Sequence, residues 1–284
     1  MQTTTNSVDE QTAQAFSTSW NNLPSGSVYT VEQFTEWMAP VSKEDVQGRE
    51  VLELGCGNGS LMVHAAGWKP SRIVGVDLGD SVLSARSNMR DSQADWEVLQ
   101  GDLTQFESAG FDLVYCIGVL HHLKQPRSGF EAVVRNTRPG GRFHCWVYAR
   151  EGNGVVRLVV EPMRRIACKL PWWTTKYLLA TPAVVPYFLY AKFLSMVTSG
   201  GTKRLRSLFA KLPLFEYSLW IARRDFAFFR HVAFDQLVTP QTCYIPEREI
   251  REWLRTHPAV DPGSTYVIFR NGNSWKFGGR ARVE

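Results

Sequence analysis

The most regular hydrophobic pattern in the chain lies between residues 50 and 148, where short apolar runs alternate with amphipathic stretches. The apolar runs have the length of buried strands, and the stretches between them place apolar residues at helical intervals. The predicted strands cover 51–54, 72–77, 96–99, 111–117 and 142–148, and the predicted helices cover 60–68, 81–89 and 130–137, the last stopped by Pro139-Gly140-Gly141. Strands alternating with helices predict parallel pairing with right-handed crossovers.

The pattern changes on both sides of this region. Aromatic residues at helix-like intervals, such as Phe34 and Trp37, predict N-terminal helices, one of them starting near Val31 behind Thr30 as its cap. These helices either form a layer packed on the core or cover a ligand pocket. Near the C-terminus we expect a charged amphipathic helix and then a hairpin, because Asn271-Gly272-Asn273 separates two short strand-like runs.

The predicted fold class is therefore α/β, with a doubly wound Rossmann-like sheet that is mostly parallel and ends in an antiparallel hairpin. N-terminal helices and a helical lid insertion are added to this core. The predicted parts are an N-terminal helical cover at 1–45, a ligand-binding core at 46–150, a hydrophobic and basic lid at 151–245, and a C-terminal helix and hairpin at 246–284 that complete the core.

The insertion differs from the core in charge and hydrophobicity. Residues 151–230 carry a net charge of +9, whereas the whole chain carries +5. Residues 177–191 are apolar and uncharged but contain Pro182 and Pro186, and Lys192 follows them. The prolines and the lysine argue against a helix that spans a membrane. Two interpretations stay open, which are a buried helical lid and a segment within 170–211 that lies on a membrane surface.

Candidate chemistry begins at the loop after the first strand, which contains Gly55, Gly57 and Gly59. Glycine lets the backbone approach a ligand, and the following helix offers free N–H groups. A dinucleotide loop of the GxGxxG type would need glycine where Ser60 stands, so the spacing argues against an NAD-dependent oxidoreductase. A carboxylate at the end of the second strand, Asp77, can accept hydrogen bonds from ribose hydroxyls.

Five motifs occur in the order and spacing of one known family. They are VLELGCGNG at 51–59, VGVD at 74–77, GD at 101–102, FDLVYCIGVLHHL at 111–123 and RPGG at 138–141. Together they resemble the class I S-adenosylmethionine-dependent methyltransferases, in particular the small-molecule group of the type 11 and type 12 kind that includes enzymes of ubiquinone and menaquinone biosynthesis. The resemblance covers about a third of the chain.

This resemblance implies S-adenosyl-L-methionine as cofactor and assigns residues to it. The three loop glycines face the methionine part of the cofactor, and Glu53 orients its amino group. Asp77 holds the ribose with Leu78 beside it, while Asp102 and Leu103 frame the adenine. The set of expected cofactor-binding residues is completed by Ile117, Gly118 and His122.

The acceptor is less well defined by the sequence. Trp172-Trp173, the apolar run and the positive charge favour a small hydrophobic or lipid-linked acceptor that is methylated on oxygen or carbon. His231 is the candidate general base, because histidine titrates near neutral pH. Tyr29 and Tyr244 are the candidate acceptor-binding residues. Alternatives are an RNA or protein methyltransferase and a non-catalytic S-adenosylmethionine-binding protein.

Other features limit partners and location. The sequence has no Asp/Asn-Pro-Pro-Tyr/Phe motif and no RNA-binding signature, so a nucleic acid partner is not expected. The five cysteines are scattered without metal-ligand spacing, so no metal is expected. Because the first twenty residues are mostly polar, we expect a cytoplasmic protein, either free or peripheral to the membrane.

Overall fold

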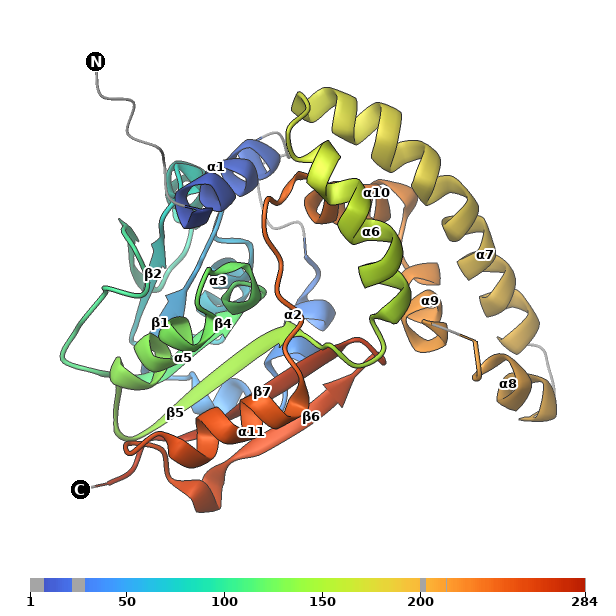
Figure 1. Cartoon of the computed structure of the whole chain (residues 1–284). Coiled ribbons are helices and arrows are strands. Elements are labelled where there is room, and N and C mark those ends of the chain that lie inside the picture. The colour runs from blue at the N-terminus through green and yellow to red at the C-terminus, as the bar shows by residue number, and fades with distance from the viewer. Residues whose placement is uncertain (1–7, 22–28, 200–202, 213, 284) are drawn as a thin grey trace. The chain divides into compact units, whose positions relative to one another are not determined.

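The computed structural model describes residues 8–21, 29–199, 203–212 and 214–283 (Figure 1). The chain divides into two compact units. The first comprises Met1–Tyr148, Gln241–Ile268 and Trp275–Glu284, and the second comprises Ala149–Pro240 and Phe269–Ser274.

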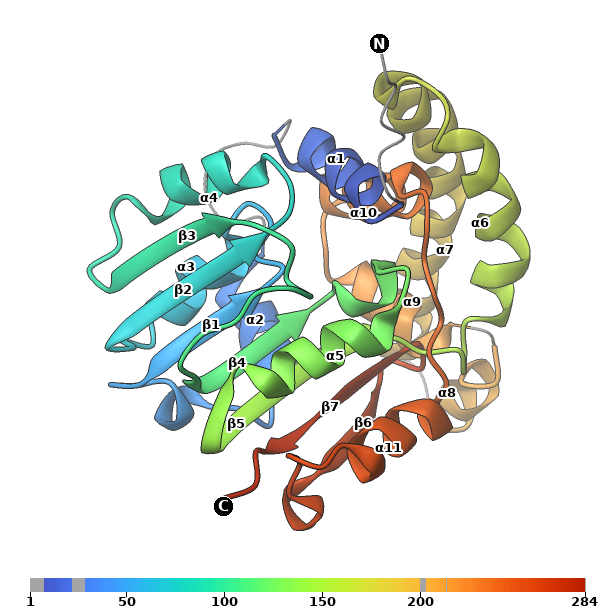
Figure 2. The same ribbon diagram turned by 60° about the vertical axis from the view of Figure 1, so that its left-hand side comes forward.

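A seven-stranded sheet forms the centre of the first unit, with the order β3-β2-β1-β4-β5-β7-β6 (Figure 2). Strands β1 to β5 pair in parallel, and β6 and β7 add an antiparallel hairpin. The predicted Rossmann-like sheet with a terminal hairpin is therefore confirmed. The strands are β1 Glu50–Leu54, β2 Arg72–Asp77, β3 Asp95–Gln100, β4 Phe111–Ile117, β5 Thr137–Tyr148, β6 Tyr266–Arg270 and β7 Ser274–Arg280.

Helices cover both faces of this sheet (Figure 2). Helices α3 (Ser60–Ala66) and α4 (Ser81–Met89) lie on one face, and α5 (Pro126–Arg135) and α11 (Glu247–Thr256) lie on the other. Phe130 of α5 stacks on Trp253 of α11 with 5.7 Å between the ring centroids, so the two helices share one apolar layer. The strand order reverses between β1 and β4, and in such sheets ligands bind at the carboxyl ends of the strands beside that reversal.

Two N-terminal helices complete the first unit. The predicted helix at Val31 is confirmed as α2 (Val31–Met38), which starts with a capping box: Thr30 and Gln33 each accept a hydrogen bond from the other's backbone N–H. Helix α1 (Val8–Asn21) lies over the loops that follow β2 and β4. Its Ser17 accepts from the N–H of Ser81, and its Asp9 accepts from the N–H of Lys124.

The predicted helix end at Thr137 was wrong. Helix α5 ends at Arg135, and Thr137 already belongs to β5. Gly140 and Gly141 lie inside that strand, where they pair with Ala281 through hydrogen bonds of 3.0 and 2.9 Å. A side chain on Gly141 would press against the Phe111 carbonyl, so glycine here permits close strand packing rather than a turn.

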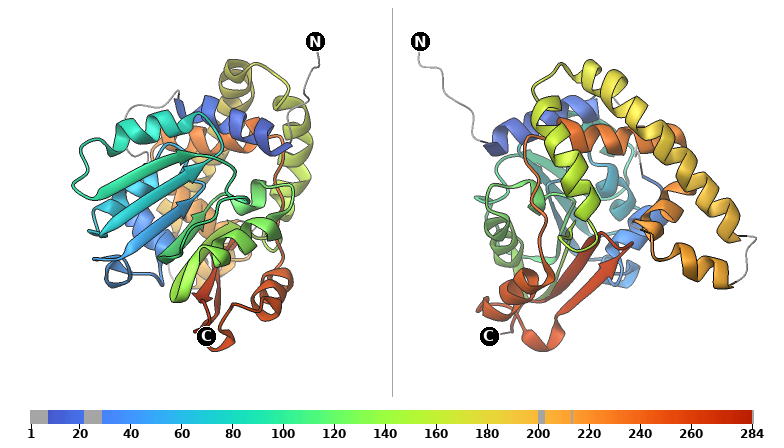
Figure 3. Two further views of the ribbon diagram at one scale, coloured as in Figure 1. Left: turned by 90° about the vertical axis from the view of Figure 1, so that its left-hand side faces the viewer. Right: turned by 45° about the vertical axis from the view of Figure 1, so that its right-hand side comes forward.

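The second unit is helical (Figure 3). Val184, Ala191, Ile221 and Phe229 form its core, where α7, α9 and α10 meet. The π-helical turn η3 precedes Pro182 of α7, which lacks the N–H that an α-helical bond would need. The helices are α6 Gly154–Ala167, η3 Thr174–Ala180, α7 Thr181–Ser199, α8 Lys203–Phe209, α9 Phe215–Ala222 and α10 Phe226–Val238.

Within the described residues, one continuous helix, Thr174–Ser199, is long and apolar enough to cross a membrane by length and composition. Only 22% of its most apolar stretch is buried in the protein. The described residues also form three short 3₁₀ turns: η1 Lys43–Asp45, η2 Leu120–His122 and η4 Pro262–Ser264.

Candidate active site

The glycine loop joins β1 to α3, and its three glycines have left-handed backbone conformations. A side chain on Gly55 would overlap Val119, and one on Gly59 would lie 3.2 Å from the backbone of Ala85. A side chain on Gly57 would meet no protein atom within 4 Å. Two of the glycines therefore permit close packing, whereas Gly57 leaves space at the carboxyl end of β1 that a ligand can fill.

Asp77, at the end of β2, fixes this loop. Its Oδ2 accepts a hydrogen bond of 2.9 Å from the N–H of Gly57. Its Oδ1 accepts from the N–H of Gly79 at 3.0 Å and from the hydroxyl of Ser81 at 3.2 Å. Burial raises the pKa of Asp77 above its usual value, against the lowering effect of these hydrogen bonds. Leu78 lies half-buried beside it and accepts from Gln100 through its carbonyl.

Glu53 is buried in β1, directly before the loop. Its Oε2 accepts a hydrogen bond of 2.8 Å from the hydroxyl of Tyr115, the residue paired with it on β4. Burial raises the pKa of Glu53 to about 8, although the Tyr115 hydrogen bond lowers it. The site therefore contains a carboxyl group that changes charge slightly above neutral pH.

Asp102 and Leu103 follow β3, where Asp102 is exposed and Leu103 is buried. The Oδ1 atom of Asp102 accepts from the N–H and the hydroxyl of Thr104, both at 2.8 Å. No hydrogen bond reaches its Oδ2 from the part of the chain that the structure describes. One carboxylate oxygen therefore orders the turn, and the other is available to a ligand.

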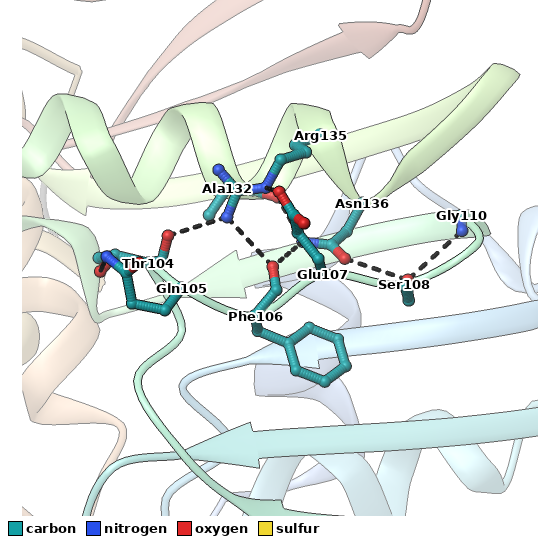
Figure 4. A network of polar contacts seen from close by, with 9 residues as sticks. All are labelled: Thr104, Gln105, Phe106, Glu107, Ser108, Gly110, Ala132, Arg135 and Asn136. Atoms are coloured by element: carbon teal, nitrogen blue, oxygen red, sulfur yellow. Dashed lines mark hydrogen bonds and ion pairs between the residues drawn. The ribbon is translucent and has the colours of Figure 1, made fainter.

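The loop after Asp102 is held by α5 through a polar network that the sequence analysis missed (Figure 4). Arg135 donates to the carbonyls of Thr104 and Phe106, at 2.8 and 3.1 Å. Asn136 donates to the Phe106 carbonyl at 2.8 Å and accepts from Ser108 at 3.0 Å. The Arg135–Asn136 pair at the end of α5 was the available signal, but its partners lie about thirty residues earlier in the chain.

Aromatic rings gather after β4 and along β5. Gly118 donates its N–H to the Trp146 carbonyl, and a side chain on Gly118 would lie 3.7 Å from the Trp146 ring. His121 lies 4.1 Å from Tyr148 between ring centroids, and Trp146 lies 5.2 Å from Tyr148. We call Trp37, His121, Trp146, Tyr148 and Tyr244 the aromatic cluster.

Four of the other candidate residues belong to the first unit. Ile117 is buried at the end of β4, and His122 is buried with its Nδ1 3.0 Å from the Gln241 carbonyl. The rings of Tyr29 and Trp37 form a T-shaped pair with 4.7 Å between their centroids, and the ring of Tyr244 stacks on Tyr148 at 6.2 Å. Both tyrosines therefore contact members of the aromatic cluster.

His231 belongs to the second unit. It is buried on α10, and its Nε2 lies 3.2 Å from the Asp235 carboxylate one turn later. Its predicted role as general base stays a prediction.

His144 on β5 is a buried polar residue that the sequence analysis did not identify. Its Nε2 lies 2.8 Å from the Trp37 carbonyl and its Nδ1 lies 2.7 Å from the Tyr266 hydroxyl. Burial lowers the pKa of His144 to about 3, so the imidazole is neutral and joins α2, β5 and β6. The sequence did not indicate this role, because His144 is a single histidine within a predicted strand.

A family profile described as a methyltransferase domain matches residues 52–145, the stretch from β1 to β5. Residues 52–145 form a class I methyltransferase domain. This class of methyltransferase domain uses S-adenosylmethionine as its methyl donor, so the predicted family and cofactor are confirmed for the domain.

Similar proteins support the same assignment over this part of the chain. A ubiquinone biosynthesis O-methyltransferase of Idiomarina loihiensis is 32% identical over 99 residues, which are 34% of this chain and 40% of the relative. A tRNA U34 carboxymethyltransferase of a Sulfurovum species is 23% identical over 129 residues, 42% of this chain and 43% of the relative. The chain spans less than half the length of these curated relatives.

Similarity to solved structures extends over most of the chain. An O-methyltransferase family protein from Burkholderia thailandensis aligns with a TM-score of 0.50 and 14% identity, over 89% of this chain and 56% of that protein. At this identity the similarity concerns the fold. The methyltransferase domain therefore shares its Rossmann-like architecture with solved methyltransferases.

Proposed function

We propose that this protein transfers a methyl group from S-adenosylmethionine to a small hydrophobic acceptor, on oxygen or carbon. The observation that carries the proposal is the space beside Gly57, at the carboxyl end of β1, in a loop that Asp77 holds through the Gly57 N–H. A methionine chain with its carboxylate can approach the backbone there because no Cβ is in the way.

The residues around the loop suit the parts of this cofactor. A carboxylate has about four lone-pair positions, and three at Asp77 are used by Gly57, Gly79 and Ser81, so a ribose hydroxyl can use the remaining one. Glu53 offers a carboxyl to the cofactor's amino group, whose positive charge favours the ionised form. The second oxygen of Asp102 can accept from the adenine amine.

The bound cofactor supplies a methyl group on a positively charged sulfur, and the acceptor takes this methyl group by directly displacing the sulfur. The chain contributes alignment of the two reactants and exclusion of water from the site. Loop geometry fixed by Asp77 and backbone geometry fixed at Gly118 by Trp146 keep these positions constant. A general base is needed only where the acceptor must lose a proton, and His231 is our candidate for that step.

The aromatic cluster favours a hydrophobic acceptor with a planar ring. Trp146 and Tyr148 are half-buried and offer ring surfaces that can pack against such a molecule. The Nε1 atom of Trp146 is buried and donates no hydrogen bond within the described residues. An unused buried donor is costly, and an acceptor oxygen would satisfy it. The relatives named ubiquinone biosynthesis O-methyltransferases suggest O-methylation of such a ring.

The test is formation of S-adenosylhomocysteine by the purified full chain with separate acceptor pools. We expect turnover with phenols, quinols or lipid extracts, and tight binding of S-adenosylmethionine by calorimetry. Turnover with tRNA alone would favour the RNA alternative, which the tRNA-modifying relative and the +9 segment support. Binding without turnover on any pool would favour a non-catalytic role, and absence of binding would refute the proposal.

A further inference from the structure

Helix α6 of the second unit has its polar and apolar faces reversed relative to a surface helix of a water-soluble protein. Arg164 is only 2% exposed, and its guanidinium donates to the Gln236 carbonyl at 2.6 Å and to the Gln236 side chain at 2.9 Å. Glu161 forms an ion pair with this guanidinium and balances its charge. Large apolar side chains of the same helix are instead exposed, with Leu158 at 78% and Ile166 at 67% exposure. A helix usually turns its apolar stripe toward the core.

These exposed residues form one stripe. Leu158 and Val159 follow Val155 by three and four residues, and Ile166 follows Val159 by seven, which places all four on one side of a helix. The buried Arg164 lies on the opposite side. We call this set the α6 stripe.

A second exposed stripe runs along η3 and α7. Its residues follow each other at intervals of three, four or seven and are Leu178, Val185, Leu189, Phe193 and Met196. The other side of α7 buries Val184, Ala191 and Leu194, so the helix is apolar on both sides. We call the exposed set the α7 stripe. It extends over nineteen residues, or about 27 Å of helix.

Exposed charges of the second unit are mostly positive. The exposed bases in the described part of 151–240 are Arg157, Arg165, Lys169, Lys192, Arg206, Lys211 and Arg223, against the exposed acids Glu151, Glu216 and Asp225. Contiguous exposed apolar surface marks an interaction site. Charged residues are depleted at the core of protein interfaces, whereas apolar stripes with basic flanks are typical of helices that lie in an anionic membrane surface.

We propose that the α6 and α7 stripes dock this protein on the surface of an anionic lipid bilayer. The apolar side chains enter the boundary between headgroups and acyl chains, and the flanking bases contact lipid phosphates. Trp173 and Tyr177, both exposed before α7, have the amphipathic rings that prefer this depth. Lys192 lies within the long helix, seven residues before its end, and its charge favours a position parallel to the surface over one across the membrane.

The test is co-sedimentation of the full chain with vesicles of phosphatidylcholine and phosphatidylglycerol. We expect binding that weakens as salt increases and that is much weaker on phosphatidylcholine alone. A variant with Leu178→Gln, Leu189→Gln and Met196→Gln should bind about 100-fold more weakly or worse, because three apolar side chains no longer enter the bilayer. Replacing Arg157, Arg165 and Lys169 with glutamine should weaken binding by a similar factor.

Controls separate docking from unfolding and from other partners. Leu83, in α4 of the first unit, is 64% exposed, close to Leu189 at 63%, and Leu83→Gln should bind like wild type. All variants should keep the wild-type melting temperature and affinity for S-adenosylmethionine, so a failure here is distinguishable from failure of the proposed function. Absence of vesicle binding at low salt would overturn the proposal. Insertion into the bilayer that resists extraction would overturn it as well. So would self-association of a protein that binds no vesicles, if the glutamine variant abolished that self-association.

Discussion

Glu53 and Tyr115 face each other across β1 and β4, and the Tyr115 hydroxyl donates a 2.8 Å hydrogen bond to the Glu53 carboxyl. The pair is buried next to the glycine loop, and burial raises the pKa of Glu53 to about 8. The carboxyl is therefore mostly protonated at neutral pH. A cationic amino group placed beside it would draw it toward its ionised form.

This pair predicts a pH dependence of stability. In the unfolded chain Glu53 loses its proton near pH 4.5, but in the folded protein it keeps the proton up to about pH 8. Raising the pH between these values favours the unfolded state, so the free energy of unfolding should fall by up to about 1.4 kcal/mol per pH unit. Glu53→Gln, which cannot ionise and can still accept from Tyr115, should remove this fall. Chemical denaturation of both proteins between pH 6.5 and 8 measures it.

The pH range is chosen because of His144. Its pKa is lowered to about 3, so its contribution to stability is complete above pH 6.5 and is lost as the pH falls toward 3. Below pH 6.5 a fall in pH destabilises the folded protein through His144 and stabilises it through Glu53. Above pH 6.5, of these two residues only Glu53 makes the free energy of unfolding depend on pH. Equal slopes for wild type and Glu53→Gln above pH 6.5 would contradict the prediction.

Gly57→Ala should separate cofactor binding from folding. The new methyl group meets no protein atom but enters the space that we assign to the cofactor. We expect the affinity for S-adenosylmethionine to fall at least about 10-fold, measured by calorimetry. Gly48→Ala is the matched control, because Gly48 also has a positive φ and open space around its Cα. If both variants lose affinity equally, the effect comes from backbone strain and not from the site.

Asp77→Ala should weaken cofactor binding by about 100-fold, because the Gly57 N–H and Gly79 N–H lose a charged acceptor. Asp80→Ala removes a nearby exposed carboxylate and so changes the net charge equally. It should leave the affinity close to that of wild type. Calorimetry that finds wild-type affinity in Asp77→Ala would remove this residue from the proposed ribose site.

His231→Ala should lower turnover by about 100-fold or more while changing cofactor affinity little, if His231 acts as general base. The turnover number and the dissociation constant of S-adenosylmethionine are measured on the same preparation. Asp235→Asn serves as a companion variant, since Asp235 contacts His231 within α10 and has no proposed contact with the acceptor. Unchanged turnover in His231→Ala would exclude the histidine from the reaction.

The sequence by itself determined the features whose causes are local. Strand and helix spacing predicted β1 to β5, and Thr30 with Gln33 marked the start of α2. The glycine loop and Asp77 were also readable, because their spacing from the strand ends is fixed by the turn that joins strand to helix.

Only the tertiary structure decided which distant residues meet. It placed Tyr115 opposite Glu53, brought Arg135 to the loop after Asp102, and put Gly140 and Gly141 inside a strand beside Ala281. Arg164 is also buried and the α6 stripe is exposed, whereas the spacing of apolar residues along the helix alone predicts the opposite. Local patterns state how apolar residues are spaced along an element, but burial and pairing depend on partners far away in the chain.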